Sequence, residues 1–146
     1  MSEALKRPSF IRPTLDTPFH IDFAWWQEND TNWRVFLQGY LCEKHQEMFK
    51  DFQDDVVIDA IDPATAEVRQ VDGLLYELTH HCARQPGFIN ANMPLIAKMF
   101  RVFLSNGNQP LSSNELSEQV GRPAATVLAT LTGPQIYKGM RIFQGV

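Results

Sequence analysis

Several features that define common protein classes are scarce or missing in this chain of 146 residues. Two cysteines are too few for a disulfide framework, so we expect a reducing, cytoplasmic setting. No apolar run approaches the roughly 20 residues that a membrane-spanning helix needs. The first residues lack the apolar core of a signal peptide. The chain has no Gly-rich phosphate-binding loop, internal repeat or low-complexity tract. These absences disfavour membrane proteins, secreted disulfide-rich proteins and P-loop or dinucleotide-binding enzymes.

The composition is that of one folded domain, or of two small modules that share a core. Hydrophobic residues make up 44% of the chain and charged residues 21%, which is typical of folded rather than disordered chains. Residues 1–92 contain 8 Lys and Arg against 15 Asp and Glu, a balance of −7. Residues 93–146 contain 5 against 2, a balance of +3. This asymmetry predicts an acidic module beside a mildly basic one, although a short chain can show it by chance.

The first half of the chain predicts an arm, a strand and a helix. Residues 1–18 contain three prolines, which bias the preceding residues toward extended backbone, so we expect an extended arm. Residues 19–23 alternate apolar and polar, which indicates a short strand. Between Thr31 and Asp51 the apolar residues fall at helical spacing and predict one amphipathic helix. The nearby aromatic residues are expected to form the core of this module or, alternatively, a binding surface: Phe19, Phe23, Trp25, Trp26 and Trp33.

The middle of the chain predicts a β-hairpin followed by a helix. Residues 56–62 are rich in β-branched side chains, and residues 67–71 form the expected return strand. The turn between them contains Asp62 and Thr65, whose side-chain oxygens can accept hydrogen bonds from nearby backbone N–H groups. Asp72 suits the N-cap of a helix that runs to about Arg84. The Pro, Gly and Asn residues of 85–92 then mark a module boundary, giving an arm (1–18), an acidic α+β module (19–91) and a C-terminal module (92–146).

The C-terminal module predicts three helices and a hairpin. A first helix has Pro94 in its first turn and ends near residues 106–108. A second begins at a capping box formed by Ser112 and Glu115 and ends at Gly121. A third begins at Pro123, and residues 135–143 are expected to form a tight hairpin that turns at 138–139.

The phrases PLSSNELSEQVGRP and IYKGMRIF, in this order of elements, resemble the winged-helix domains of bacterial regulators. We therefore expect an α+β fold in which N-terminal helices and a small β-hairpin accompany a C-terminal winged helix-turn-helix. The resemblance implies a third helix that enters the major groove of DNA and a hairpin, the wing, that contacts phosphates or the minor groove. By position, Arg122, Thr126 and Thr130 would lie at the base-contacting helix, with Lys138 and Arg141 on the wing.

The resemblance predicts a non-enzymatic regulatory protein that associates with DNA. We expect a dimer, because one wing and one weakly base-contacting helix supply little affinity. The third helix departs from the family pattern, because Thr126 and Thr130 are its only polar side chains and base contact usually needs Arg, Lys, Asn or Gln. The alternative is therefore an adaptor whose winged helix binds another protein. A third alternative is a small metal-binding protein or an unrecognised enzyme.

The His and Cys residues suggest a metal site, with Cys42 and His45 on one predicted helix and His80, His81 and Cys82 on another. On continuous helices these side chains would point in different directions, so we expect no metal, no cofactor and no catalytic residue. Cys42 and His45 could touch as a thiol and base, but the sequence shows no third group to complete a nucleophilic site.

Overall fold

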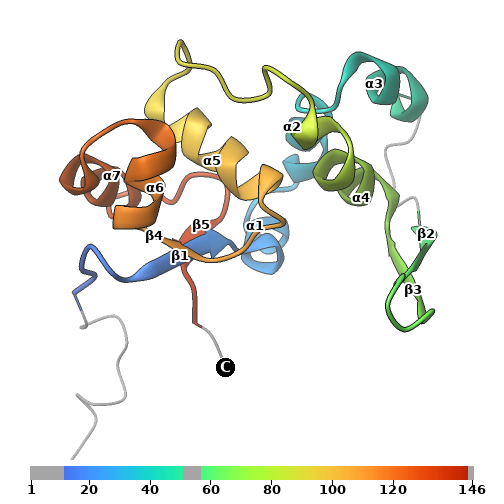
Figure 1. Ribbon diagram of the computed structural model, residues 1–146, viewed down its shortest axis with the longest axis horizontal. Coiled ribbons are helices and arrows are strands. Elements are labelled where there is room, and N and C mark those ends of the chain that lie inside the picture. The colour runs from blue at the N-terminus through green and yellow to red at the C-terminus, as the bar shows by residue number, and fades with distance from the viewer. Residues whose placement is uncertain (1–11, 51–56, 145–146) are drawn as a thin grey trace, which may run out of the picture.

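The computed structural model describes residues 12–50 and 57–144 (Figure 1). The expectations for residues 1–11 of the arm, for the end of the helix and the start of the strand within 51–56, and for 145–146 lie outside the described residues. Helices combine with small antiparallel sheets, which confirms the α+β class. Within the described residues, no helix has both the length and the apolar character needed to cross a bilayer.

The helices follow one another along the described chain, with one consecutive strand pair and three single strands before, between and after them. The helices are α1 (Phe23–Asn29), α2 (Trp33–Gln38), α3 (Glu43–Phe49), α4 (Gly73–His80), the 3-10 helix η3 (Cys82–Arg84), α5 (Leu95–Ser105), α6 (Ser113–Val120) and α7 (Ala124–Leu131). The strands are β1 (Pro18–Ile21), β2 (Val57–Ile61), β3 (Val68–Asp72), β4 (Leu111–Ser112) and β5 (Met140–Ile142).

Strand β1 lies at the centre of a three-stranded antiparallel sheet with the order β4-β1-β5. Phe19 pairs with Leu111 on one side and with Ile142 on the other. The predicted alternation is confirmed over residues 19–21, because Phe19 and Ile21 are buried and His20 is half-buried. The strand is shorter than the predicted 19–23, because Asp22 caps α1 and Phe23 begins it. The Asn108 side chain holds the end of the strand, since its Oδ1 accepts from Ile21 N and its Nδ2 donates to Ile21 O, both at 2.8 Å.

The predicted C-terminal hairpin is wrong in its strand partner. The tight turn is present, with Lys138 and Gly139 at φ 48° and 79° and Met140 N donating to Tyr137 O at 2.9 Å. Residues 135–137 form no strand, and β5 pairs with β1 instead. A strand from the N-terminal part of the chain therefore takes the place that the first strand of the wing would have occupied.

The helix-turn-helix segment forms as its local sequence predicts. Ser112 Oγ accepts from Glu115 N at 3.2 Å, and the Glu115 carboxylate accepts from Ser112 N at 2.8 Å, which confirms the capping box. Gly121 ends α6 in the left-handed conformation, with φ 72°. Because both ends of α6 are fixed by residues within the segment, the direction in which α7 leaves it is fixed too.

The β2–β3 hairpin is also confirmed, with Val57 paired to Asp72 and Ile61 to Val68. In the turn, Asp62 Oδ1 accepts from Ala64 N at 2.8 Å and Thr65 Oγ1 accepts from Glu67 N at 3.2 Å, as expected. The next helix, α4, has the predicted N-cap, because Asp72 Oδ1 accepts from Leu75 N.

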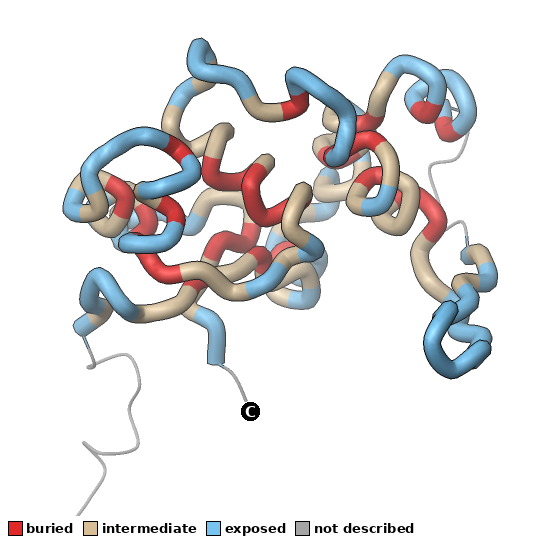
Figure 2. The backbone as a smooth tube through the Cα atoms, in the orientation of Figure 1, coloured by how far each residue is buried: buried red, intermediate tan, exposed pale blue. Residues whose placement is uncertain are grey.

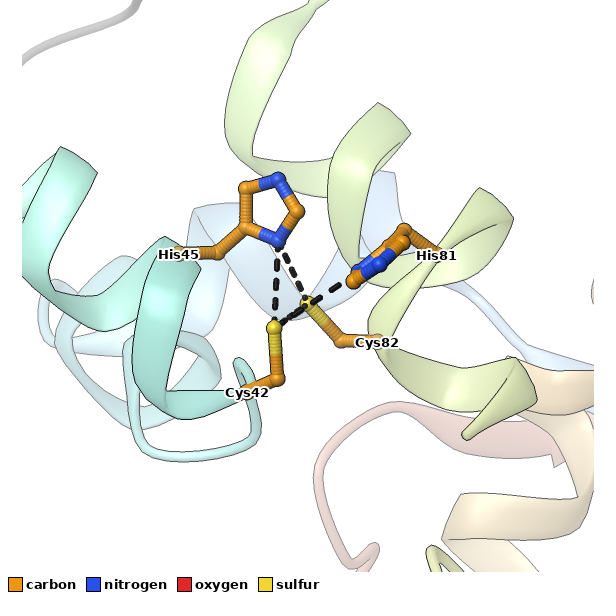
Figure 3. Close-up of side chains that lie close together, drawn as sticks. All are labelled: Cys42, His45, His81 and Cys82. Carbon is orange, nitrogen blue, oxygen red and sulfur yellow. Dashed lines mark hydrogen bonds between the residues drawn. The ribbon is translucent and has the colours of Figure 1, made fainter. Parts of the chain in front are cut away.

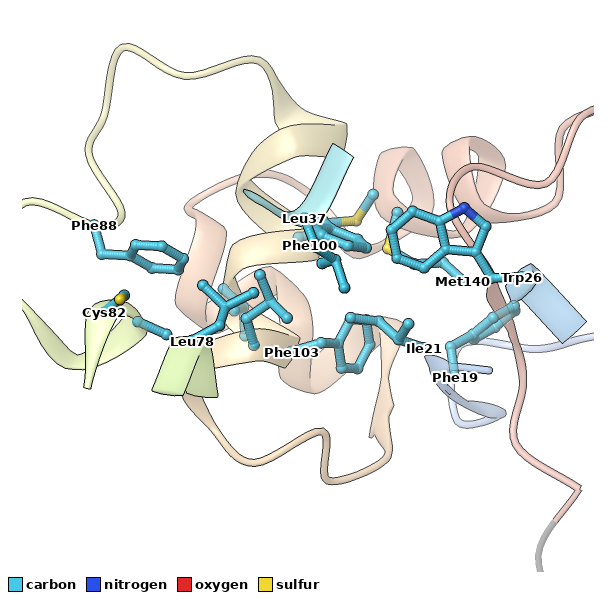
Figure 4. Packing of buried hydrophobic residues seen from close by; sticks show 14 of the residues in the cluster. Phe19, Ile21, Trp26, Leu37, Leu78, Cys82, Phe88, Phe100, Phe103 and Met140 are labelled. Carbon is cyan, nitrogen blue, oxygen red and sulfur yellow. The ribbon is translucent and has the colours of Figure 1, made fainter. Parts of the chain in front are cut away.

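One hydrophobic core receives side chains from both of the predicted modules (Figures 2 and 4). Helix α5 contributes most to it, with five buried side chains: Met99, Phe100, Val102, Phe103 and Leu104. The predicted aromatic core is confirmed in that Phe19 and Trp26 are buried and Phe23, Trp25 and Trp33 pack against it. The close-up in Figure 4 places Trp26 and Phe19 at one end of this core and Cys82 at the other.

Two glycines with similar backbone and different surroundings test this packing. A Cβ on Gly139 would lie 2.9 Å from Asp22 O, whereas nothing lies within 4 Å of a Cβ on Gly121. For Gly121→Ala we expect a loss of about 1–2 kcal/mol in unfolding free energy from the left-handed backbone alone. For Gly139→Ala we expect roughly 1–3 kcal/mol more, from overpacking against α1. Urea denaturation of both variants measures the difference, and equal losses would contradict the close approach of this turn to α1.

Candidate metal centre

The amphipathic helix predicted over residues 31–51 is interrupted, and the interruption sets the position of Cys42. Helix α2 ends at Gln38, and the N–H groups of Gly39, Tyr40 and Leu41 each donate to a carbonyl three residues earlier. Cys42 is then extended, with φ −68° and ψ 163°, and becomes the N-cap residue of α3. The single continuous helix was therefore a wrong prediction, because the chain changes direction between α2 and α3.

A second interruption separates His81 from α4. The helix ends at His80, and His81 has φ −125° and ψ −64°, outside the helical range. Cys82 begins η3 in a new direction, with its thiol in the core. Because the backbone turns at His81, two adjacent residues can present side chains to the same point, which a continuous helix does not allow.

Four side chains from these two segments converge (Figure 3). Cys42 Sγ lies 3.2 Å from His45 Nδ1, 3.6 Å from His81 Nδ1 and 3.4 Å from Cys82 Sγ. Cys82 Sγ lies 3.3 Å from His45 Nδ1. All four candidate ligand atoms are within 4.8 Å of one another, and the residues are Cys42, His45, His81 and Cys82.

The expectation that the backbone scatters these groups is therefore wrong. It assumed that each helix continues through its Cys and His residues, and both helices are interrupted at those residues. Of the five Cys and His side chains considered, only His80 points away from the others, as expected. Its ring stacks on Tyr76, with the ring centres 4.0 Å apart.

The cluster is partly shielded from solvent and has a carboxylate behind it. His45 is 3% exposed and Cys82 is 2% exposed, whereas Cys42 and His81 are half-buried. His45 Nε2 lies 2.8 Å from Glu77 Oε2. In the tautomer that carries hydrogen on Nε2, this N–H donates a hydrogen bond to Glu77, and Nδ1 presents its lone pair to the two sulfur atoms.

The two thiols have different acidities in this arrangement. Burial raises the pKa of Cys42, but hydrogen bonds from the backbone and ring of His45, and from Cys82 and His81, outweigh it and bring the pKa to about 6. For Cys82, burial and the neighbouring Cys42 raise the pKa to about 11. The pair therefore holds one thiolate readily at neutral pH, whereas a second negative charge needs a compensating cation.

Of the residues predicted to contact DNA, three lie on or next to α7, at the opposite end of the molecule from this cluster (Figure 1). The other two lie in the turn before β5 (Lys138) and on β5 (Arg141). Arg122 is exposed in the turn just before α7. Thr126 and Thr130 are half-buried on α7, and Thr130 Oγ1 donates to Thr126 O at 2.9 Å. Both residues thus keep part of their surface exposed, and the Thr130 hydroxyl donates within α7.

The two basic residues assigned to the wing contact N-terminal helices. Lys138 Nζ is 4.0 Å from the centre of the Phe36 ring. The Arg141 guanidinium lies 5.1 Å from the Trp25 ring and donates to Asp22 Oδ2 at 3.0 Å. Both cations thus stabilise the packing of the strand region on α1 and α2.

Comparison of the chain with protein-family models, curated proteins and solved structures found no match. The arrangement of the four Cys and His side chains is therefore interpreted from its own geometry. The sequence signal for it was a Cys-x-x-His pair and a His-Cys pair, with 35 residues between them, each on a predicted helix.

Proposed function

We propose that Cys42, His45, His81 and Cys82 bind one metal ion, and that Zn²⁺ is the ion that suits them best. The observation that carries this proposal is the convergence of two sulfur and two imidazole nitrogen atoms within 4.8 Å. A tetrahedral metal ion bound by protein side chains requires this kind of convergence of Cys and His side chains.

The spacing of the four atoms fits a tetrahedral ion. With Zn–S about 2.3 Å and Zn–N about 2.0–2.1 Å, the edges of a tetrahedral Cys₂His₂ site are about 3.3–3.8 Å. The four contacts among the ligand atoms, at 3.2, 3.3, 3.4 and 3.6 Å, differ from these edges by a few tenths of an ångström. These are four of the six edges. The other two, from His81 to His45 and to Cys82, lie within 4.8 Å, so the movement on binding falls mainly on His81.

The donor set selects the class of metal. Thiolate and imidazole ligands favour zinc and other transition metals, whereas calcium and magnesium prefer oxygen ligands. Two thiolates also balance the two charges of Zn²⁺, so that the bound centre would be neutral where Cys82 and His45 are buried. Metal-binding histidines in proteins are commonly oriented by a carboxylate that accepts from their second ring nitrogen. Glu77 is in the position to do this for His45.

A site with four protein ligands has a structural role, because a catalytic zinc keeps one position for water or substrate. The ion would join α3 to the end of α4 and to η3. Helix α3 has seven residues, and its buried side chains are His45 and Phe49. A helix of this length is not stable alone, so the metal would supply much of what holds it in place.

Adjacent histidines provide a matched test of metal binding. We expect the purified chain to contain one zinc per molecule, His81→Ala to reduce the affinity at least tenfold, and His80→Ala to leave it unchanged. The reason is that His81 Nδ1 lies 3.6 Å from Cys42 Sγ in the cluster, whereas His80 stacks on Tyr76. Metal analysis and competition with a chromogenic chelator measure both. An equal effect of the two variants, or no bound metal in the wild-type chain, would sink the proposal.

Glu77 tests the support behind the ligand. Glu77→Gln removes the charge that orients the imidazole of His45, so we expect the zinc affinity to fall by about 10–100-fold. Glu118→Gln is the control, because Glu118 is exposed on α6. Chelator competition again gives the affinities, and unchanged binding in Glu77→Gln would show that the carboxylate has no part in the centre.

Association with DNA through α6 and α7 is a second candidate function. The observations that favour it are the predicted helix-turn-helix, with its capping box and its left-handed Gly121, and the exposed Arg122 just before α7. The engagement of Lys138 and Arg141 with Phe36, Trp25 and Asp22 leaves less charge for phosphates. Backbone contact by a dimer, or docking of the same helices on a protein, accounts for these features better than base-specific contact.

A salt titration separates the DNA and protein candidates. If Arg122 contacts a phosphate, Arg122→Ala should reduce the slope of log affinity against log salt by about 0.9, because one counterion fewer is released. Lys44→Ala, which removes an exposed charge on α3, serves as the control. Fluorescence anisotropy with labelled duplex DNA measures both slopes. Absence of binding at low salt would contradict DNA association and favour a protein partner.

A further inference from the structure

We propose that the centre is redox-sensitive, with Cys42 and Cys82 forming a disulfide on exposure to peroxide and releasing the metal. This inference rests on the proposed metal binding and adds a regulation to it. The chain contains two cysteines in all, and both belong to the cluster. Any disulfide within one molecule therefore removes both sulfur ligands at once.

The two sulfur atoms are close enough to bond after a small movement. Their separation is 3.4 Å, and a disulfide requires about 2.05 Å. Cys42 lies in the turn before α3, and Cys82 begins η3, so each thiol sits where the backbone has just left an α-helix. Figure 3 shows the two side chains reaching toward each other from opposite elements.

The exposure of the two thiols assigns them different roles. Cys42 is half-buried and reachable by a small oxidant, whereas Cys82 is 2% exposed and lies directly behind it. The Cys42 sulfur would attack one oxygen of hydrogen peroxide, forming a sulfenic acid and releasing water after protonation. The Cys82 sulfur would then attack the Cys42 sulfur, and the hydroxyl group would leave as a second water.

Hydrogen peroxide is the one oxidant that disulfide formation requires. Two metal-bound thiolates lose two electrons to form the S–S bond, and hydrogen peroxide with two protons takes these electrons to give two water molecules. The ion is left with His45 and His81, since the sulfur of a disulfide is a poor ligand compared with a thiolate. A dithiol reductant reverses the change by reducing the disulfide to two thiols.

The disulfide would also replace the structural link that the metal provides. The two cysteines are 40 positions apart in the chain, and the covalent bond joins α3 to η3 at the place where the ion did. The oxidised protein should thus keep its fold while it loses zinc. This separates the proposed switch from oxidative damage, which would unfold α3.

The test uses the full wild-type chain loaded with zinc and treated with increasing hydrogen peroxide. Released zinc is measured with a chromogenic chelator, and intact mass is measured on the same samples. We expect one zinc released per disulfide formed, a monomer lighter by about 2 Da, and recovery of zinc binding after dithiothreitol. In Cys82→Ser, where the second attack cannot occur, the Cys42 sulfenic acid should accumulate and react with dimedone.

Three results would overturn the inference, and they point to different failures. If zinc-loaded protein gains oxygen atoms instead of losing two hydrogens, the disulfide is refuted while the proposed metal binding stands. Disulfide formation between two molecules, visible as a dimer on a non-reducing gel, refutes the pairing within one cluster. A chain that holds no zinc before peroxide is added refutes the proposed metal binding, and with it the release.

Discussion

The packing of aromatic rings around Phe100 is the interaction on which the rest of this structure depends. Phe100 lies in the middle of α5, and its ring centre is 5.3–6.2 Å from four other rings, those of Trp26, Phe36, Tyr40 and Tyr137. These rings come from α1, α2, the turn after α2 and the segment before β5. Edge-to-face contacts of this kind add to the apolar area that the core buries. One residue thus joins the N-terminal helices to the segment that leads into β5.

The same cluster places the candidate metal centre. Tyr40 is two residues before Cys42, and its ring contacts both Phe100 and the Arg101 guanidinium, the latter at 4.6 Å. Arg101 in turn donates to Phe88 O at 3.0 Å, in the segment that follows η3. Helix α5 therefore holds the turn that carries Cys42 and the chain beyond Cys82 in fixed relation. The core thus positions Cys42 and Cys82, and the metal would hold α3, with His45, against them.

The sequence predicted what is encoded within a few neighbouring residues. The capping box of Ser112 and Glu115, the hairpin turn at Asp62 and Thr65 and the N-cap at Asp72 all depend on local hydrogen bonds, and all were confirmed. The strand partner of β5 and the metal cluster depend on contacts between distant segments. The prediction that the Cys and His side chains point in different directions assumed that both helices continue. The helices are interrupted after Gln38 and at His81, so the side chains converge instead. The resemblance to winged-helix regulators remains a prediction about partners.

X-ray absorption at the zinc edge of the purified full chain tests the central claim most directly. The account predicts one zinc with two sulfur neighbours at about 2.3 Å and two nitrogen neighbours at about 2.0–2.1 Å. Loss of the sulfur shell in a Cys42→Ser, Cys82→Ser double variant would identify these neighbours. A zinc surrounded by oxygen and nitrogen alone, or a chain that retains no zinc, would contradict the claim that Cys42, His45, His81 and Cys82 form a metal centre.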